Sequence, residues 1–171
     1  MLSLEFQVPS IIVLIGVSGA GKSSFARSLF LPTEILSSDA CRALISDEEN
    51  DQSVTAQAFS LLLAIARLRL ARGRLCVIDA TNLNPRDRSK YLVLGNEVGC
   101  PVSALVLDPG INVCLARTIK RMDRDVSQEA VRRQYDEFVA NLPSLGSEGY
   151  SRVWHLAGEQ AVTAVRVLRI R

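Results

Sequence analysis

Short runs of apolar residues alternate with longer amphipathic stretches along the chain. Residues 11–15 (IIVLI) are apolar throughout and mostly β-branched, the pattern of a strand covered on both faces in a parallel sheet. Two more runs of this kind, residues 75–80 and 102–107, each follow a helical candidate. The alternation predicts a doubly wound α/β fold, in which a mainly parallel sheet has helices on both faces.

Capping residues mark where the amphipathic stretches begin and end. One stretch opens at Asn84-Pro85 and closes at Gly99, with proline in a tolerated first-turn position and glycine after the last turn. Together the patterns predict helices over residues 52–72, 85–98, 111–121 and 128–139. Residues 152–156 and 162–169 are predicted as terminal strands, although the second segment also fits a helix. With no repeat or linker, a single domain over residues 1–171 is expected.

Charge is nearly balanced, with 20 basic and 18 acidic residues among 171. The balance excludes a histone-like polycation, so any contact with nucleic acid must be local. Seventeen basic residues are arginines, whose planar fork can bind two phosphate oxygens at once. The four cysteines form no C-x-x-C pair, no signal sequence precedes residue 11, and no apolar run approaches about 18 residues. We therefore expect reduced thiols, no membrane partner and a cytoplasmic protein.

Residues 16–23 (GVSGAGKS) match the phosphate-binding pattern G-x-x-x-x-G-K-[ST], between a predicted strand and a predicted helix. The glycines allow a tight turn whose N–H groups converge on an anion at the helix N-terminus. Lys22 is expected to reach the β- and γ-phosphates, and the Ser23 hydroxyl to bind Mg²⁺. The sequence contains no Asn-Lys-x-Asp guanine-reading element, which favours ATP or a site with loose selectivity among nucleotides. The expected contacts of this loop with the nucleotide are Gly16, Ser18, Gly19, Ala20, Gly21, Lys22, Ser23 and Ser24.

Asp79 ends the apolar run of residues 75–80, at the carboxyl end of the predicted sheet. In P-loop proteins a carboxylate at this place lies near the metal. An aspartate near a helix start also serves as its N-terminal cap. We favour a metal-binding role for Asp79 beside Ser23, with the cap as the alternative.

Asp39 and Arg42 lie three residues apart, after a short apolar stretch at residues 35–36. If a helix starts at Asp39, both side chains project from the same side, which places a proton acceptor beside a phosphate-binding fork. On spacing alone, an N-cap aspartate with a solvated arginine is the better interpretation.

Residues 117–124 contain four cations, and Arg117, Arg121 and Arg124 fall on one face if this tract is helical. Such a run most often marks a solvated helix. In a P-loop protein it is also the composition of a mobile arginine lid, which can stabilise the transferred phosphate and accelerate transfer by roughly 10³ to 10⁵. We place this lid over residues 117–135.

Nearly the whole chain resembles the kinase domain of bacterial polynucleotide kinase-phosphatase, within the polynucleotide 5′-kinase group. The resemblance lies in five elements, which are the P-loop, residues 37–42 (SSDACR), residues 49–52 (ENDQ), residues 77–82 (VIDATN) and the arginine lid. It implies ATP-dependent phosphorylation of a 5′-OH end of RNA or DNA. The chain departs from that family in having no room for phosphatase or ligase modules, so separate enzymes of those classes are possible partners.

The resemblance also implies a role for individual residues. Asp39 matches the general base, and Arg42 matches the clamp on the acceptor's 3′-phosphate. Gln52, Thr81 and Val131 match positions near the acceptor nucleotide. Lys22, Arg121 and Arg124 are expected to act in catalysis, and Arg117 to contact ATP. Two alternatives remain open, a small-metabolite kinase of the gluconate, shikimate or adenylylsulfate type, and a non-catalytic binding module gated by ATP.

Overall fold

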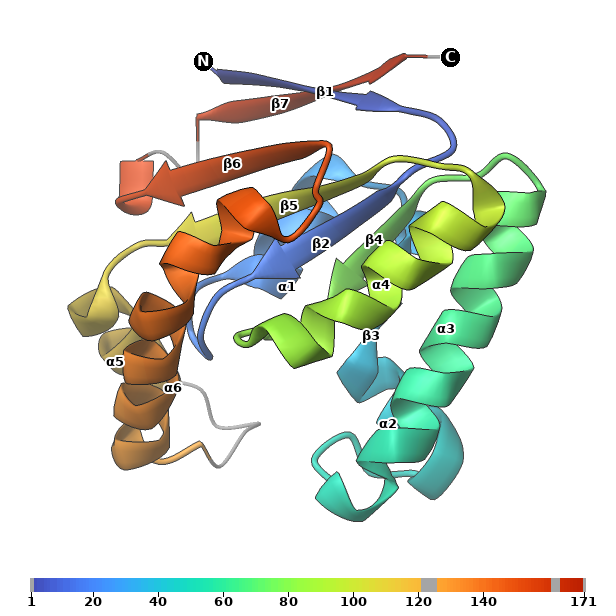
Figure 1. Ribbon diagram of the computed structural model, residues 1–171. Coiled ribbons are helices and arrows are strands. Elements are labelled where there is room, and N and C mark those ends of the chain that lie inside the picture. The colour runs from blue at the N-terminus through green and yellow to red at the C-terminus, as the bar shows by residue number, and fades with distance from the viewer. Residues whose placement is uncertain (1, 121–125, 161–163, 171) are drawn as a thin grey trace.

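Five parallel strands form the central sheet of the computed structural model, which describes residues 2–120, 126–160 and 164–170 (Figure 1). The strand order is β3–β4–β2–β5–β6, and every neighbouring pair is parallel. The prediction of a doubly wound α/β fold is therefore confirmed. The strands are β2 (Ile11–Ile15), β3 (Ile35–Ser37), β4 (Cys76–Asp79), β5 (Val102–Asp108) and β6 (Arg152–Ala157).

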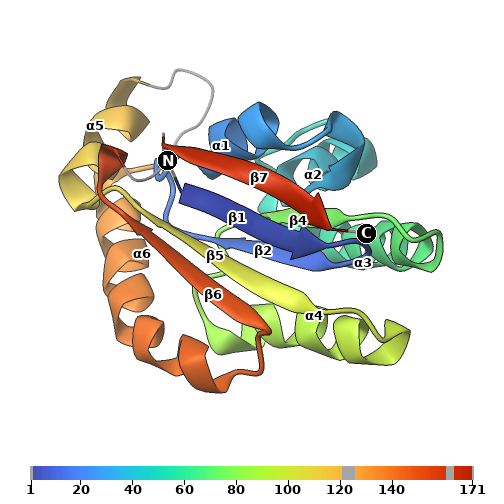
Figure 2. The ribbon, with the colours of Figure 1, turned by 90° about the horizontal axis from the view of Figure 1, so that it is seen from above.

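Helices cover both faces of this sheet (Figure 2). Helices α4 and α6 lie on one face and α1 on the other, while α3 packs against both α2 and α4. The helices are α1 (Lys22–Leu29), α2 (Ser38–Ser46), α3 (Thr55–Ala71), α4 (Pro85–Val98), α5 (Ile111–Lys120) and α6 (Gln128–Asn141). The structure also contains three 3-10 helices, Pro32–Glu34, Gln52–Val54 and Leu142–Ser147.

Most helix boundaries follow the predicted caps. The Asn84 side chain accepts a hydrogen bond from the Asp87 N–H at the start of α4, and Gly99 ends that helix with φ 68°. The predicted helix over residues 52–72 is divided, because Asp51 caps a short 3-10 turn and α3 begins only at Thr55. Local side-chain hydrogen bonds thus set where these helices start.

A second, two-stranded sheet joins the ends of the chain. Strand β1 (Leu2–Gln7), which the sequence pattern did not reveal, pairs in parallel with β7 (Val165–Ile170), so the last segment is a strand and not a helix. Phe6 of β1 anchors this pair on the main domain. Its ring centroid lies 4.9 Å from that of Trp154 in β6 and 6.1 Å from that of Phe30, just after α1.

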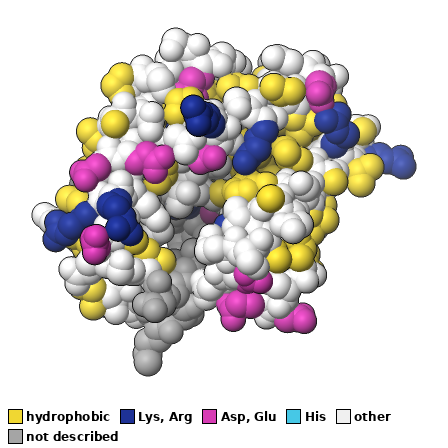
Figure 3. Space-filling model, turned by 60° about the horizontal axis from the view of Figure 1, so that its bottom comes forward, with side chains coloured by type: hydrophobic (Ala, Val, Ile, Leu, Met, Phe, Trp, Pro, Cys, Tyr) yellow, Lys and Arg dark blue, Asp and Glu magenta, His cyan; other side chains and the backbone are white. Residues whose placement is uncertain are grey.

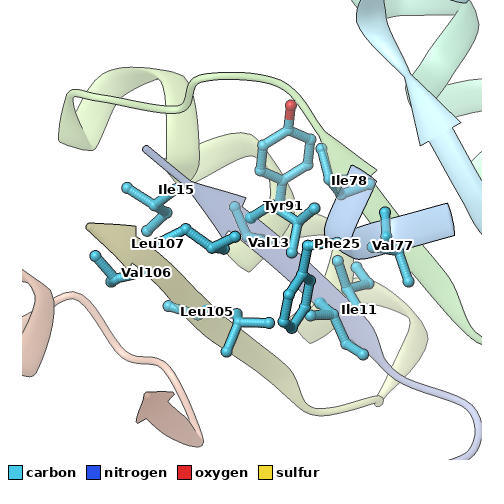
Figure 4. Close-up of a cluster of buried hydrophobic side chains, with 14 of the residues drawn as sticks. Ile11, Val13, Ile15, Phe25, Val77, Ile78, Tyr91, Leu105, Val106 and Leu107 are labelled. Atoms are coloured by element: carbon cyan, nitrogen blue, oxygen red, sulfur yellow. The ribbon is translucent and has the colours of Figure 1, made fainter. Parts of the chain in front are cut away.

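The core is built on β2, β4 and β5, whose side chains are buried on both faces (Figure 4). Tyr91 of α4 packs against the strands, and Phe25 is contributed by α1. Because neither face of these strands meets water, their sequences are continuously apolar and do not alternate. The rigid core holds the carboxyl ends of β2, β3 and β4 next to one another, and the loops that follow these strands build the candidate site.

The stretch Gln52–Ala71 is long and apolar enough, by length and composition alone, to cross a membrane, contrary to the expectation from the sequence. In this fold the stretch includes α3, a helix that packs against the core. Ala58, Leu62, Ala66 and Leu70 are buried in the core, and Phe59, Leu61, Leu63 and Ile65 pack against it.

Candidate active site

The loop between β2 and α1 has the backbone geometry of a phosphate cradle. Gly19 and Gly21 adopt φ of 82° and 92°, a left-handed conformation that side chains with a Cβ rarely adopt. A Cβ on Gly19 would also lie 2.4 Å from the Cys114 carbonyl oxygen. Gly21 is the N-cap of α1. The glycines therefore let the loop turn tightly against α5 and open its N–H groups toward the helix N-terminus.

Two cations already contact this loop. The Lys22 Nζ donates a hydrogen bond to the Val17 carbonyl oxygen at 3.0 Å, which folds the lysine back over the loop. Arg117 in α5 points one guanidinium nitrogen at the Gly19 and Ala20 carbonyl oxygens, both at 3.5 Å, and forms an ion pair with Glu159 at 2.7 Å. Two cationic side chains thus lie against the backbone of the cradle.

Cys114 lies beneath the cradle and is a packing residue. Burial raises the pKa of its thiol to about 11, an effect that the nearby Lys22 and Arg117 only partly offset. The thiol is therefore protonated at neutral pH and is a poor nucleophile.

Gln134 of α6 reaches into the same loop, and sequence analysis did not single it out. Its side-chain oxygen accepts a hydrogen bond from the Ser18 N–H at 2.8 Å. The Gln134 side chain thus accepts a hydrogen bond from one of the N–H groups that the loop could offer to a phosphate.

Asp39 and Arg42 form an ion pair in α2, with the carboxylate oxygen 2.6 Å from the guanidinium nitrogen. The helix is capped by Ser37, which accepts from the Ala40 N–H, so Asp39 lies in the first turn and does not act as the cap. Arg42 also donates to the Thr55 hydroxyl at 3.3 Å, and that hydroxyl donates to the Gln52 side chain. This series of hydrogen bonds fixes the positions of the Asp39 carboxylate and the Arg42 guanidinium group.

Asp79 fits a metal-binding role. It is 7% exposed, lines the same cavity as Ser23, and makes no side-chain hydrogen bond or ion pair with another described residue. The alternative of a helix cap is wrong, because Asn84 caps α4. A buried carboxylate that no described residue neutralises, together with a serine hydroxyl in the same cavity, offers the hard oxygen ligands that Mg²⁺ prefers.

These groups surround one cavity of about 1110 Å³. Figure 3 shows the hollowed face of the molecule, with charged side chains of both signs around it. The cavity brings together most of the residues predicted from the sequence, namely Ser18, Gly19, Gly21, Lys22, Ser23, Ser24, Asp39, Arg42, Gln52, Asp79, Thr81 and Arg117.

Three predicted residues do not line the cavity. Val131 is fully buried, because its face of α6 packs into the core, and Val126 lines the cavity instead. Gly16 and Ala20 belong to the loop but do not line the cavity. The Gly16 N–H donates to the Thr81 carbonyl oxygen, and a Cβ on Gly16 would lie 2.7 Å from the Leu107 carbonyl oxygen. Arg121 and Arg124 lie outside the described residues.

Sequence reasoning also missed Phe59 and Asn82 in the cavity wall. Phe59 is an aromatic residue on α3, and the Lys90 ammonium group lies 3.7 Å from its ring centroid. Asn82 has a positive φ of 51°, and its side-chain amide donates to the Leu14 carbonyl oxygen at 2.8 Å. The run VIDATN contained Asn82, but a positive φ at a residue other than glycine has no reliable sequence signature.

The fold and the cavity define a P-loop protein of the kinase-like class, with a nucleotide cradle at one end of the cavity and an acid–arginine pair lining the same cavity. Residues 11–145 match the family model of the AAA domain AAA_33. The chain belongs to this family.

Among individual proteins, the chain is similar to one assigned as a bifunctional polynucleotide kinase/RNA ligase of Autographa californica nuclear polyhedrosis virus. The two are 24% identical over 159 residues, which cover 81% of this chain and 22% of the viral protein. The chain therefore spans about a fifth of that relative's length.

Three solved structures share the fold. A chain of the Pnkp1/Rnl/Hen1 RNA repair complex matches with a TM-score of 0.69 and 20% identity, over 81% of this chain and 47% of that one. Kti12 of Chaetomium thermophilum, solved with ADP-AlF3, matches with a TM-score of 0.66 and 16% identity, over 90% of this chain and 93% of that one. Shikimate kinase of Acinetobacter baumannii matches with a TM-score of 0.55 and 18% identity, over 91% of this chain and 88% of that one. At these identities the matches show the fold alone.

Proposed function

We propose that the chain is a polynucleotide 5′-hydroxyl kinase, which transfers the γ-phosphoryl group of ATP to a 5′-OH end of RNA or DNA. The observation that carries this proposal is the Asp39–Arg42 pair, which lines the same cavity as Lys22 of the P-loop. A base and an anion-binding fork that share a cavity with a phosphate cradle are parts that in-line phosphoryl transfer needs.

In the proposed reaction, the Asp39 carboxylate takes the proton from the 5′-hydroxyl group as its oxygen attacks the γ-phosphorus of ATP. The bond between the γ-phosphorus and the β–γ bridging oxygen breaks, and ADP leaves. Lys22, the P-loop N–H groups and Arg117 stabilise the charge on the moving phosphoryl group. When bound by Ser23 and Asp79, Mg²⁺ would neutralise phosphate charge. Most of the rate enhancement is expected from positioning.

The acceptor side of the cavity supports a role for the remaining predicted residues. Arg42 would clamp the 3′-phosphate of the terminal nucleotide, and Gln52 and Thr81, which line the same cavity, are proposed to contact its sugar or base. Arg121 and Arg124 are proposed to complete a lid over residues 117–135. The product, a 5′-phosphate end, is the group that a ligase joins to a 3′-OH, so a separate phosphatase and ligase are proposed partners.

A small-metabolite kinase is the second candidate, favoured by the match to shikimate kinase over 88% of that enzyme. A labelled-ATP transfer assay separates the candidates, with 5′-OH RNA, 5′-OH DNA and a panel of sugar metabolites as acceptors. We expect transfer to the 5′-OH strands and none to matched strands that already carry a 5′-phosphate. Transfer to metabolites alone would reject the proposal, as would tight retention of ATP without transfer, which would indicate a non-catalytic binding module.

A further inference from the structure

A second hollow, of about 1000 Å³, lies at the opposite end of the sheet from the P-loop, where α3 ends and β4 begins. Four arginines line it, namely Arg69, Arg72, Arg74 and Arg169, together with apolar side chains that include Val8, Leu31 and Leu75. An adjoining hollow of about 600 Å³ shares Arg69, Arg72 and Arg74 and adds Ile65 and Leu68. We call the two together the arginine hollow. The phosphoryl-transfer site described above uses none of these residues.

Positive charge in the arginine hollow is largely uncompensated. Glu34 is its single acidic residue among the described ones, and that carboxylate is already bound by Arg169 through two hydrogen bonds of 3.1 and 2.6 Å. The exposed guanidinium groups of Arg72 and Arg74 make no hydrogen bond or ion pair with another described residue. The net excess of three positive charges in this one hollow is larger than the +2 of the whole chain.

Three of these arginines, Arg69, Arg72 and Arg74, lie at the turn that closes α3. The Gly73 and Arg74 N–H groups donate to the Leu70 and Arg69 carbonyl oxygens, at 2.9 and 3.0 Å, in the Schellman arrangement that closes α3. Arg69 donates to the Leu75 carbonyl oxygen at 3.1 Å, and its Nε atom is buried without a hydrogen-bond partner. The turn and this contact fix the backbone from which Arg72 and Arg74 project.

Helix α3 connects the arginine hollow with the active-site cavity. Thr55 and Phe59 at its start line the cavity, and Ile65, Leu68 and Arg69 near its end line the hollow. Its 17 residues contain no acid, so no carboxylate on it repels a phosphate chain that follows the helix. They span about 25 Å, which corresponds to roughly seven nucleotides at 3.4 Å each in a stacked strand.

We propose that the arginine hollow binds backbone phosphates of the acceptor strand, roughly seven nucleotides from the 5′-OH end that lies in the active-site cavity. Arg72 and Arg74 form the charged rim that holds phosphate oxygens, and Leu31 and Leu68 offer apolar surface to the sugar or base faces. The inference rests on the proposed function and makes the acceptor a strand of at least this length.

The test compares the double variant Arg72→Gln/Arg74→Gln with the unchanged protein. Binding of a labelled 5′-OH strand of roughly 16 nucleotides, about twice the estimated span, is measured without ATP by fluorescence anisotropy over a range of salt concentrations. We expect the variant to bind this strand about tenfold more weakly, with a salt slope lower by about 1.4 for two lost phosphate contacts. The KM for a dinucleotide acceptor, and kcat, should not change.

Two control variants accompany this test. Arg67→Gln removes a charge from the same helix, but from an arginine that already pairs with Glu97 at 2.5 Å, and it should leave strand binding unchanged. Arg72→Lys/Arg74→Lys keeps both charges and should retain binding within about threefold. Equal loss of affinity for the long strand and the dinucleotide, or no loss for either, would overturn the proposal.

Other outcomes separate this inference from the proposed function. Length-dependent binding that falls in the double variant, without phosphoryl transfer, would reject the kinase assignment and retain the strand-binding site. Normal transfer with binding that does not depend on strand length would reject the site alone. If AMP displaced the long strand as effectively as a competing strand does, the hollow would be a mononucleotide pocket and the strand proposal would be wrong.

Discussion

The side-chain oxygen of Gln134 lies 2.8 Å from the backbone nitrogen of Ser18, within the phosphate-binding loop. This hydrogen bond joins helix α6 to the P-loop. It uses the Ser18 N–H, which could otherwise donate to a phosphate oxygen. Any nucleotide that uses the Ser18 N–H must displace this glutamine, so the position of α6 and the occupancy of the cradle are coupled.

Gln134→Glu should weaken ADP and ATP binding at least tenfold. The substitution keeps the acceptor for the Ser18 N–H but places a negative charge where phosphate must bind. Isothermal titration calorimetry measures the change. Gln128→Glu, at an exposed position on the same helix, is the matched control and should bind nucleotide normally. Unchanged affinity in Gln134→Glu would show that this glutamine leaves the cradle before nucleotide enters.

Asp39→Asn should keep ATP binding and lower turnover by roughly 10² to 10⁴, because the amide cannot accept the hydroxyl proton. The amide retains an oxygen to accept from Arg42, so the local hydrogen-bond chain to Thr55 should survive. Single-turnover kinetics with labelled ATP measure the chemical step. Turnover within a few-fold of normal would remove Asp39 from the role of general base.

Arg42→Ala should cost more on an acceptor with a 3′-phosphate than on a bare nucleoside. A buried, charge-assisted contact to that phosphate is worth about 1.5–3 kcal/mol, which predicts a ratio of roughly ten to a hundred between the two losses in kcat/KM. Loss of the pairing with Asp39 affects both acceptors equally, so the comparison isolates the clamp. Equal losses would favour a metabolite kinase.

Gly19→Ala should disable the cradle. The new Cβ would meet the Cys114 carbonyl oxygen at 2.4 Å in a left-handed conformation, so we expect a loss of stability of about 2 kcal/mol or more and nucleotide binding weakened more than tenfold. Gly146→Ala is the control, because no atom lies within 4 Å of its Cβ position and its φ is not positive. Its stability should change by about 0.5 kcal/mol at most.

Glu148→Gln should destabilise the domain by about 3 kcal/mol at neutral pH, because it leaves the charge of Arg88, which is 1% exposed, without its counter-ion. Burial opposes the charged carboxylate, but hydrogen bonds from Arg88 and Ser144 outweigh it and hold the pKa of Glu148 below its ordinary 4.5. A lowered pKa contributes stability that is complete above pH 4.5 and is lost as the pH falls through the folded-state value.

The difference between the two proteins should therefore shrink under acid conditions, as measured by urea unfolding across pH. Glu129→Gln provides the comparison, since Glu129 is 80% exposed in its pair with Arg133 and should change stability by less than about 1 kcal/mol at any pH. A pH-independent difference would show that packing, and not charge, carries the effect.

Local signals account for what the sequence predicted well. Asn84 and Gly99 delimit α4, and the apolar runs identify β2, β4 and β5, because caps and buried strands are encoded in neighbouring residues. The P-loop is also local, since its glycines and lysine must be contiguous. Asp39, Arg42 and Asp79 follow strands whose carboxyl ends meet at one edge of a parallel sheet, so the fold brings them together.

What the sequence did not reveal depends on pairing between distant residues. The partner of β1 lies about 160 positions away, so its short alternating pattern had no local confirmation. Val131 and Val126 are both apolar residues near the start of α6, and only the packing of that helix decides which one faces the cavity. Gln134 carries no motif, and its role follows from the place where α6 lies.

The pairing of β1 with β7 has a consequence for biosynthesis. Leu4 and Phe6 are synthesised about 160 residues before Val165–Ile170, the strand that pairs with theirs. Until then the nascent polypeptide exposes two large apolar side chains on an unpaired strand, a feature that invites aggregation. Strand β1 therefore reaches its native surroundings only after a segment about 160 residues further along has been made.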